Sequence, residues 1–291
     1  MLTLVFLSFH SEHHIRRLVK SIDTKYSIII IENSGNKKLK SDLEETYKNV
    51  SVVICEENLG FSKGMNLGIK LSKTPFVFIN PADIRISNES LNLLSEVIVN
   101  FKNFGMLSPV YRDKSVHSNY QIWNNSKKDE EISLSGKKIK LKEVDFIDGT
   151  IVLNKQLLNN MFFDENIFIY FETMDLCKRL RDKKIRMYAV DEITFDHFGG
   201  QSHDKKYDHE AHLSRNWHYN WSKFYFYNKH NNYFYALKKV LPNLRQSIIG
   251  YIKNIFKDRK ERELYSAEFK GIISSILKKK SNYRPYNKNE L

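Results

Sequence analysis

Cysteine, proline and glycine are all scarce in this sequence: its 291 residues include 2, 5 and 11 of them, respectively. Two cysteines are too few for a disulfide framework, so we expect a chain that folds in a reducing compartment, with the cytosol as the default. Apolar runs are short, and none approaches the roughly 18 residues that a membrane-spanning helix needs. The run Leu2–Leu7 has no basic residue before it and no small-residue cleavage site after it, which predicts a strand and not a signal peptide.

Other absences narrow the class of protein further. The sequence contains no internal repeat, no low-complexity segment, and neither a P-loop nor a G-x-G-x-x-G motif. Two common phosphate-binding loops are therefore excluded. Hydrophobic residues, in contrast, make up 41% of the chain, which is too much for a disordered protein and enough for a sizeable core.

Positive charge is concentrated in the last third of the chain. Residues 205–291 contain 19 basic and 7 acidic residues, and so carry +12 of the formal net charge of +13. The same segment has a dense aromatic cluster between Trp217 and Tyr235. Three hypotheses fit this composition: packing on the main domain, contact with an anionic membrane surface, and, least favoured, nucleic-acid binding. We divide the chain into residues 1–204 and a helical, basic, aromatic extension, residues 205–291, and expect no nucleic-acid partner.

Four short apolar runs in the first part of the chain have the length of buried strands: Leu2–Leu7, Ser27–Ile31, Val50–Ile54 and Phe76–Ile79. Helical stretches separate them, which predicts an α/β fold with a mixed, mainly parallel sheet flanked by helices. In such sheets, ligands bind outside the carboxyl ends of the strands. The candidate residues that follow these ends are His10, Glu32, Asn58 and Asp83. Residues 111–142 are rich in lysine, and this composition predicts a segment made mainly of loops.

Three segments contain candidate chemistry. The glycine-rich Asn58–Gly68 predicts a loop running into a helix, with backbone N–H groups close to a phosphate or sugar, although turn glycines alone would give the same pattern. Asp83, at the end of a buried strand, suits either a divalent cation on a diphosphate or a turn and helix cap. Glu172 and Asp175 are spaced i, i+3 and share one face of a helix, where they suit either acid–base chemistry or stabilising charge at a helix N-terminus.

These segments, in this order, resemble the family 2 glycosyltransferases, and particularly their rhamnosyltransferase-like branch. Six elements carry the resemblance: Val5–Glu12 (first strand and nucleotide-facing loop), Ile31–Ser34 (V-D-N-x-S), Glu57–Gly68 (N-x-G-F-x-x-G-x-N-x-G), Phe146–Leu153 (G-x-x-x-L), Phe163–Leu180 (F-D-E-x-x-F-x-Y-x-E-x-x-D-L-x-x-R) and His197–Ser202 (H-x-x-G-x-S). The resemblance covers about residues 1–204 and implies a GT-A, Rossmann-like catalytic domain.

The resemblance also implies an activity and a set of site residues. It implies an inverting transferase that moves rhamnose or a similar sugar from a nucleotide-diphosphate donor, a dTDP- or UDP-sugar, to a lipid-linked or oligosaccharide acceptor in cell-surface polysaccharide synthesis. Glu32 would contact the nucleotide base, and the other donor-binding residues would be His10, Asn58, Gly60, Lys63, Gly64, Asn66 and Asp83. Asp83 and His197 would hold Mg²⁺ or Mn²⁺. The acceptor-side residues would be Gly149, Asp164 and Glu165, and Asp175 or Glu172 would be the catalytic base.

The sequence departs from the family pattern at two places that matter. Ala82 intervenes between Asn80-Pro81 and the metal-binding acid, Asp83. Thr173 stands where the family has the Asp assigned as catalytic base, and a Thr hydroxyl is no useful base near neutral pH. The base would then be Glu172 or Asp175, or else the protein is a non-catalytic nucleotide-sugar or membrane-surface binding protein on a transferase fold. A sugar-nucleotide pyrophosphorylase is disfavoured, because its glycine- and Arg/Lys-rich start is missing.

The basic extension fits the implied acceptor. Sugars are often added to lipid-linked acceptors at the inner face of the cytoplasmic membrane, and each Lys or Arg near an anionic surface contributes about 1 kcal/mol of attraction. We therefore expect a cytoplasmic protein, peripheral at that face, with residues 205–291 at the anionic membrane surface.

Overall fold

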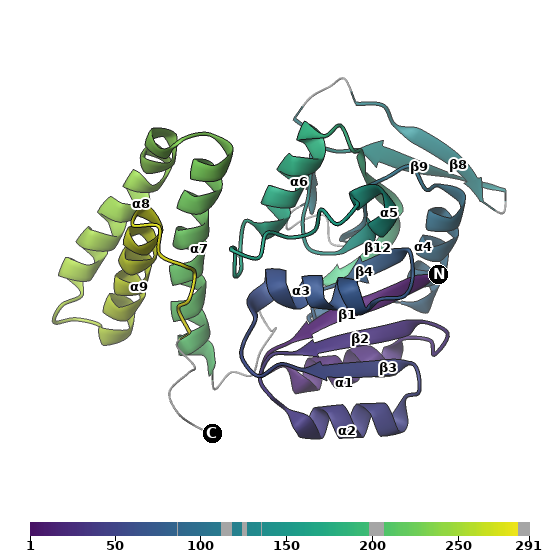
Figure 1. Ribbon diagram of the computed structural model, residues 1–291, viewed down its shortest axis with the longest axis horizontal. Coiled ribbons are helices and arrows are strands. Elements are labelled where there is room, and N and C mark those ends of the chain that lie inside the picture. The colour runs from purple at the N-terminus through teal and green to yellow at the C-terminus, as the bar shows by residue number, and fades with distance from the viewer. Residues whose placement is uncertain (86, 112–117, 124–126, 135, 198–206, 285–291) are drawn as a thin grey trace. The chain divides into compact units, whose positions relative to one another are not determined.

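The chain divides into two compact units in its structure, a computed structural model (Figure 1). The structure describes residues 1–85, 87–111, 118–123, 127–134, 136–197 and 207–284. The first unit comprises residues 1–59, 64–163 and 176–202, and the second comprises residues 60–63, 164–175 and 203–291. The second unit therefore includes two segments from within residues 1–204 as well as the C-terminal extension.

A ten-stranded mixed sheet forms the centre of the first unit, in the order β3-β2-β1-β4-β11-β6-β12-β9-β8, with β5 paired to β12. Its strands are β1 (Leu2–Ser8), β2 (Ser27–Glu32), β3 (Val50–Ile54), β4 (Phe76–Ile79), β5 (Ile84–Arg85), β6 (Met106–Tyr111), β8 (Glu130–Leu134), β9 (Lys137–Glu143), β11 (Ile151–Asn154) and β12 (Met187–His197). Only β5, β9 and β11 run against the common direction among these strands. The predicted mixed, mainly parallel sheet is confirmed, and β7 (Tyr120–Gln121) pairs with β10 (Phe146–Ile147) in a small second sheet.

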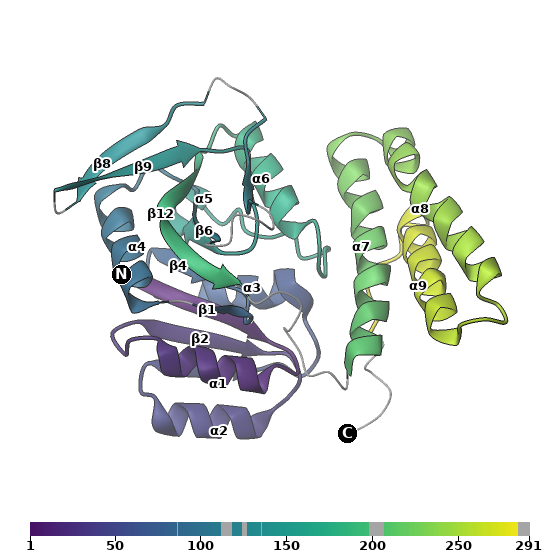
Figure 2. The same cartoon turned by 180° about the vertical axis from the view of Figure 1, so that it is seen from behind.

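Helices α1 (Glu12–Ser21), α2 (Lys37–Thr46) and α4 (Asn88–Asn100) cover one face of this sheet (Figure 2). Their apolar sides join the strands in one buried cluster that includes Phe6, Leu39 and Leu94. Two of these helices begin at a side chain that caps them: Asn36 accepts a hydrogen bond from the N–H of Leu39, and Ser87 accepts one from that of Ser90. The other helices of this region are α3 (Gly60–Leu71), α5 (Lys155–Leu158) and α6 (Glu172–Asp182).

The glycine-rich segment was predicted as a loop running into a helix, and the helix begins at Gly60, earlier than expected. Helix α3 begins at Gly60 and continues through Gly64 and Gly68, which lie on one side of it at i, i+4 spacing. A Cβ atom on Gly64 would lie 2.5 Å from Leu7 Cδ1, and one on Gly68 would lie 2.3 Å from Val5 Cγ1. These glycines therefore let α3 pack closely on β1. Residues 111–142 also differ from the prediction, because Glu130–Leu134 (β8) pairs antiparallel with Lys137–Glu143 (β9).

We expect Gly68→Ala to lower the free energy of unfolding by about 1–3 kcal/mol, because the added methyl group overpacks the contact with Val5. The loss should occur although alanine is the better helix former by about 1 kcal/mol. Denaturant unfolding measures it, and a double-mutant cycle with Val5→Ala supplies the control: the smaller side chain should absorb part of the penalty. A Gly68→Ala protein as stable as the wild type would contradict this account of the packing.

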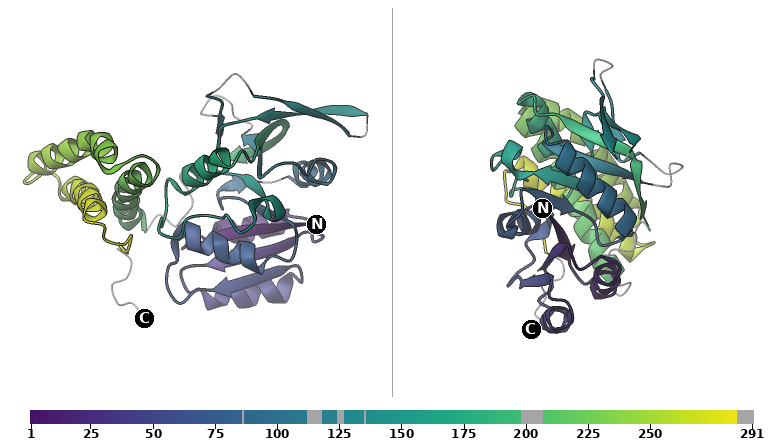
Figure 3. Two further views of the ribbon diagram at one scale, coloured as in Figure 1. Left: turned by 45° about the horizontal axis from the view of Figure 1, so that its top comes forward. Right: turned by 90° about the vertical axis from the view of Figure 1, so that its right-hand side faces the viewer.

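Three helices make up most of the second unit: α7 (Asp208–His230), α8 (Tyr233–Lys253) and α9 (Arg259–Ile276), which lie side by side in Figures 1 and 3. This confirms the helical C-terminal region. Their core contains Phe224, Val240 and Ile272, and a second cluster contains Trp217 and Trp221. None of the helices within the described ranges combines the length and the hydropathy that crossing a bilayer requires.

His218 anchors the segment after α9 to α7. It is fully buried, its Nδ1 lies 2.9 Å from Ser281 Oγ, and its Nε2 lies 2.8 Å from the carbonyl oxygen of Tyr283. The carbonyl can only accept, so Nε2 carries the proton, and in the neutral ring Nδ1 accepts from the Ser281 hydroxyl. Burial lowers the pKa of His218 to about 3, because the charged imidazolium would lose its hydration.

The protein should therefore lose stability as the pH falls from 6.5 towards 3. Between these values the unfolded chain binds a proton at His218 and the folded chain does not, so each pH unit costs about 1.4 kcal/mol. Denaturant unfolding at a series of pH values measures this slope. Other groups also titrate in this range, so the informative comparison is with His218→Gln, which should flatten the slope, whereas His212→Gln at an exposed position should not. An unchanged slope in His218→Gln would show that the buried imidazole is not responsible.

Candidate active site

The strands of the first unit that share the common direction end at one edge of the sheet. The last residues of β2, β6 and β12 at this edge are Glu32, Tyr111 and His197. His10 and Asp83 follow β1 and β4 within a few residues. The topology thus gathers four of the predicted site residues, His10, Glu32, Asp83 and His197, at the edge where open α/β sheets bind ligands.

The two predicted metal ligands lie on paired strands. Strand β5 pairs with β12 so that Ile84 is opposite His197 and Arg85 is opposite Asp196. Asp83, directly before Ile84, is 8% exposed. The pairing therefore places Asp83 one residue before Ile84, the backbone partner of His197.

A buried hydrogen bond fixes the turn that carries Asp83. The Thr150 hydroxyl donates to Asn80 Oδ1 at 2.9 Å, and both residues are fully buried. The N–H of Ile84 donates to the carbonyl oxygen of Pro81 at 3.2 Å, which closes the turn. Ala82 lengthens this turn relative to the family pattern. The Thr150–Asn80 and Ile84–Pro81 hydrogen bonds nevertheless hold the backbone before and after Asp83.

A second acid at this edge, Asp148, was missed by the sequence analysis. Gly149, which follows it, has φ +77°, and a Cβ there would lie 2.0 Å from the hydroxyl oxygen of Tyr111. Burial raises the pKa of Tyr111, and the negative charges of Asp148 and Asp83 raise it further. Asp148 itself has surface open to solvent, yet the surrounding protein removes enough water to raise its pKa. In the sequence, the feature that could have indicated Asp148 is its place directly before Gly149, a predicted acceptor-side residue.

Glu32 and His10 belong to adjoining loops. Glu32 is buried, and its Oε1 accepts from the N–H of Ser34 at 2.5 Å and from the Ser34 hydroxyl. The same hydroxyl accepts a long hydrogen bond, 3.4 Å, from the N–H of His10. His10 has φ +50°, a left-handed conformation that residues with a Cβ adopt uncommonly. This loop therefore contains a strained residue beside Glu32.

The predicted donor residues around α3 take different structural places. Asn66 uses both halves of its amide on the backbone of Phe163, at 2.9 and 3.1 Å, and so ties α3 to that segment. Gly60 has φ +73° and belongs to the second unit, where a Cβ would lie 2.3 Å from the ring of Phe168. Lys63 is exposed and Asn58 is half-buried. Gly60 and Gly64 therefore serve close packing, and Lys63 has the solvent access that a phosphate contact requires.

The turn before Glu172 is strained. Tyr170 and Phe171 both have positive φ, +67° and +66°, a conformation that side chains with a Cβ rarely adopt. Aromatic rings of α7 hold this turn: the Tyr219 ring centroid lies 5.8 Å from that of Tyr170 and 5.4 Å from that of Phe171, and Phe226 lies 5.6 Å from Phe171. These aromatics of α7 therefore fix the backbone that leads to the predicted base.

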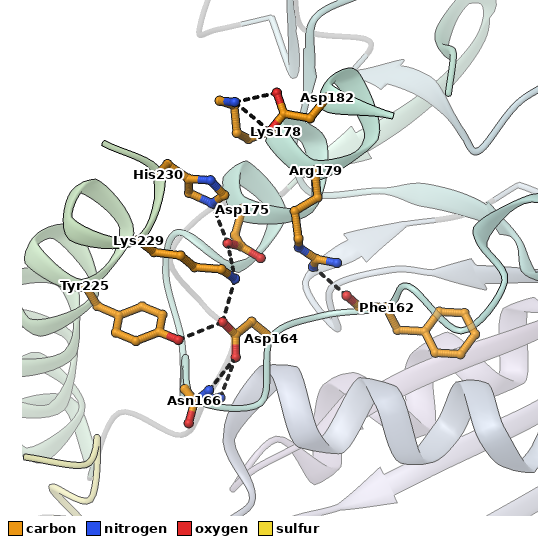
Figure 4. A network of polar contacts seen from close by, with 10 residues as sticks. All are labelled: Phe162, Asp164, Asn166, Asp175, Lys178, Arg179, Asp182, Tyr225, Lys229 and His230. Atoms are coloured by element: carbon orange, nitrogen blue, oxygen red, sulfur yellow. Dashed lines mark hydrogen bonds and ion pairs between the residues drawn. The ribbon is translucent and has the colours of Figure 1, made fainter. Parts of the chain in front are cut away.

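Asp175, the other predicted base, lies in a network of polar contacts with α7 (Figure 4). It is fully buried, and its Oδ1 is 2.6 Å from Lys229 Nζ and 2.7 Å from His230 Nε2. Lys229 also contacts Asp164 at 2.7 Å, and the Tyr225 hydroxyl donates to the same acid at 2.9 Å. Burial alone would raise the pKa of Asp164, but Lys229, the N–H of Asn166 and the Tyr225 hydroxyl together hold the pKa below its usual value.

These contacts distinguish the two predicted bases. The carboxylate of Asp175 is paired with Lys229 and His230 of α7. Glu172, in the same first turn, is 9% exposed. Thr173, in place of the usual Asp, is buried. Asp164, predicted on the acceptor side, contacts Tyr225 and Lys229 of α7, whereas its neighbour Glu165 is exposed.

A divalent cation at this edge of the first unit would need ligands from its substrate. Within the described residues, no group of three or more His, Cys, Asp or Glu side chains is placed to hold a metal ion by itself. The residues present nevertheless fit Mg²⁺ or Mn²⁺. The negative field of Asp83 and Asp148, felt by Tyr111, favours a cation, and such sites often combine one or two protein ligands with substrate phosphates.

We expect Asp175→Asn to lower the free energy of unfolding by about 1–3 kcal/mol, because it removes the buried charge that contacts Lys229 and His230 while Lys229 keeps its contact with Asp164. Asp182→Asn is the matched control: Asp182 lies on the same helix and pairs with Lys178 at the surface, where a pair contributes at most about 1 kcal/mol. Denaturant unfolding of both variants measures the difference. Equal stability of the two variants would show that the Asp175 network is not a structural anchor.

Comparison with known proteins identifies the family. A sequence profile of glycosyl transferase family 2 matches residues 3–162, more than half of the chain. The low-salt glycan biosynthesis hexosyltransferase Agl10 of Haloferax volcanii is 23% identical over 198 residues, 64% of this chain and 63% of that protein. The chain thus spans less than two thirds of the length of that relative.

Two solved structures share the fold over nearly the whole chain. One is the mannosyltransferase PcManGT from Pyrobaculum calidifontis, in complex with GDP-Man and Mn²⁺, with a TM-score of 0.56 and 12% identity over 96% of this chain and 88% of that chain. The other is residues 1–349 of S. aureus TarS, in complex with UDP-GlcNAc, with a TM-score of 0.52 and 14% identity over 96% and 92% of the two chains. These identities show the fold alone, which is the predicted GT-A fold. The profile match shows the family, and this chain belongs to glycosyl transferase family 2.

Proposed function

We propose that the protein is an inverting, metal-dependent glycosyltransferase that moves a sugar from a nucleotide-diphosphate donor to an acceptor hydroxyl. The observation that carries the proposal is the β5–β12 pairing, which puts Asp83 beside the position opposite His197 at the carboxyl edge of a family 2 sheet. An acid and a histidine there suit a cation on a diphosphate.

In this proposal the loops after β1 and β2 receive the nucleotide. Glu32 contacts the base through the loop that Ser34 orders, and the strained His10 forms the adjoining wall. The exposed Lys63 adds positive charge for the phosphates. Support for a nucleotide-sugar donor comes from the solved relatives, whose ligands are GDP-Man and UDP-GlcNAc. The experiment below tests which nucleotide the donor carries, dTDP, UDP or GDP, and whether its sugar is rhamnose.

Asp83 and His197 would hold Mg²⁺ or Mn²⁺, which when bound offsets the charge that develops on the leaving diphosphate. The turn locked by Thr150 and Asn80 keeps Asp83 in place for this role. Glu172 takes the proton from the acceptor hydroxyl as it attacks the anomeric carbon from the face opposite the leaving group. No covalent sugar–enzyme intermediate is required, and the configuration of the anomeric carbon inverts.

The acceptor in this proposal is a lipid-linked or oligosaccharide hydroxyl, used in glycan or polysaccharide synthesis at the inner face of the cytoplasmic membrane. The similarity to a glycan biosynthesis hexosyltransferase supports the acceptor class. The excess of positive charge in residues 205–291 supports the location. A second candidate, a nucleotide-sugar binding protein without activity, is favoured by one observation: Thr173 replaces the usual base.

The test is nucleotide-diphosphate release from a panel of dTDP-, UDP- and GDP-sugars, with Mn²⁺ or with EDTA, in the presence of an oligosaccharide acceptor. We expect metal-dependent release from one donor class, and its loss in Asp83→Ala. Glu172→Gln should lower kcat by about 10²- to 10⁴-fold with little change in donor affinity, because general-base catalysis contributes about that factor.

Asp182→Asn is the control for the removal of a negative charge from α6, the helix that contains Glu172, and this variant should retain full activity. Donor binding is measured separately by calorimetry. Tight binding of one donor without turnover of any would favour the non-catalytic candidate. Release that is unaffected by EDTA and by Asp83→Ala would overturn the metal site. Full activity in Glu172→Gln would assign the base elsewhere.

A further inference from the structure

The aromatic and basic residues of the C-terminal extension separate into two groups in the structure. On α7, Trp217, Trp221, Phe224 and Phe226 are buried and pack on residues of the second unit. On α8 and the turn after it, apolar side chains point outward. Of the 18 large hydrophobic residues that are exposed among those described, nine lie within residues 233–256, so exposed apolar surface is concentrated there.

One stripe of α8 contains four of these nine residues. Its residues are spaced alternately four and three apart, which keeps them on one face of a helix: Phe234, Lys238, Leu241, Arg245, Ile248 and Ile252. All six are exposed, with Phe234 at 80%, Leu241 at 61% and Ile252 at 60%. Phe256, in the turn after the helix, is 98% exposed.

The opposite face of α8 holds the helix to the rest of its unit. Ala236, Val240, Ser247 and Gly250 are buried, and a Cβ on Gly250 would lie 2.5 Å from the ring of Tyr265 on α9. Ala236 and Val240 pack with Phe224 of α7 and Ile272 of α9. The helix is therefore anchored on one side, and the stripe faces away from the packing within the second unit.

The charge of α8 and the turn after it indicates which kind of surface the stripe can bind. Residues 233–257 contain five Lys or Arg residues and no Asp or Glu. A second copy of the chain would bring Lys238 and Arg245 against the same cations, which opposes self-association. An anionic lipid surface satisfies both features, because the apolar side chains enter the acyl boundary while the lysine and arginine ends reach the head groups.

A hollow beside the stripe adds detail. Its volume is about 590 Å³, its walls include Leu241, Ile249 and Tyr265, and its charged residues are Arg245 and Lys253. Two cations above an apolar wall match a phospholipid, whose phosphate is anionic and whose chains are apolar.

We propose that the exposed stripe of α8 is a membrane-binding face, which lies in the plane of an anionic phospholipid bilayer with Phe234, Ile252 and Phe256 in the acyl boundary. This localises to one helix a contact that composition suggested for the whole extension, and it excludes the buried aromatics of α7 from that contact. The inference does not depend on the transferase proposal, because it rests on the surface of α8 alone.

The experiment is sedimentation of the full-length protein, without donor, with vesicles of phosphatidylcholine alone or of phosphatidylcholine with phosphatidylglycerol. We expect binding to the anionic vesicles only, weakened by added salt. Lys238→Glu/Arg245→Glu and Phe234→Ser/Ile252→Ser should each lower the partition coefficient by about tenfold or more, since both basic and apolar contacts contribute.

Matched controls change exposed residues of the first unit. Lys48→Glu/Lys73→Glu alters the net charge by the same amount, and Val99→Ser/Leu157→Ser removes exposed apolar side chains of α4 and α5. Both should bind vesicles within about twofold of the wild type, since only charges near the lipid surface contribute strongly. Thermal unfolding of every variant checks that it is folded.

Three results would overturn the proposal: equal binding to neutral and anionic vesicles, α8 variants that bind as well as their controls, or a concentration-dependent dimer that Phe234→Ser/Ile252→Ser abolishes. The last result, measured by size-exclusion chromatography with light scattering, would assign the stripe to a second copy of the chain. Nucleotide-diphosphate release with a water-soluble acceptor should be unchanged in the α8 variants, so failure of this inference leaves the transferase proposal intact.

Discussion

The contact of buried Asp175 with Lys229 and His230 is the interaction on which the second unit depends. It joins the start of α6 to α7, and the contact of Lys229 with Asp164 joins the other end of residues 164–175 to the same helix. A buried carboxylate is tolerable only with such partners, because an isolated charge would lose its hydration without compensation. The residues that the family resemblance assigns to catalysis therefore fold with the C-terminal helices, and the extension is part of the machinery that shapes the predicted base.

The strands could be predicted from sequence because a strand buried on both faces must be apolar throughout, as Ile28–Ile31 is. The early start of α3 at Gly60 could not, since glycine is equally typical of a turn and of a close helix contact, and only the position of Val5 and Leu7 decides between them. The hairpin β8–β9 was not predicted. Lys138–Lys142 alternates between lysine and an apolar residue, which is typical of a strand, but a high lysine content is equally typical of a solvated loop. For the candidate site, the sequence indicated Glu32 and Asp83, while Asp148 became visible only through its position near Tyr111.

Composition could not separate the aromatics of α7 from those of α8, and helical phase can. In α8 the exposed stripe repeats at four and three residues, and the buried set from Ala236 to Gly250 lies on the opposite side of the helix. In α7 the aromatics are used on several sides: Trp221 donates to the carbonyl of Lys279, Phe226 packs on Phe171, and Phe224 enters the helical core. An average over 87 residues hides this difference, so the charge and the aromatic content of the extension describe two surfaces with separate physical roles.

The change from Asp to Thr at position 173 has a physical consequence for its neighbours. Two adjacent carboxylates beside Asp175 would put three negative charges in the first turn of α6, and like charges at this distance oppose one another's ionisation. With Thr173 buried and Asp175 held by Lys229, the remaining carboxylate of that turn is Glu172. It follows the two left-handed residues Tyr170 and Phe171, and backbone strain of this kind persists only where surrounding contacts enforce it. The aromatic rings of α7 supply that enforcement, so the geometry at Glu172 is held by packing that the replacement at 173 does not disturb.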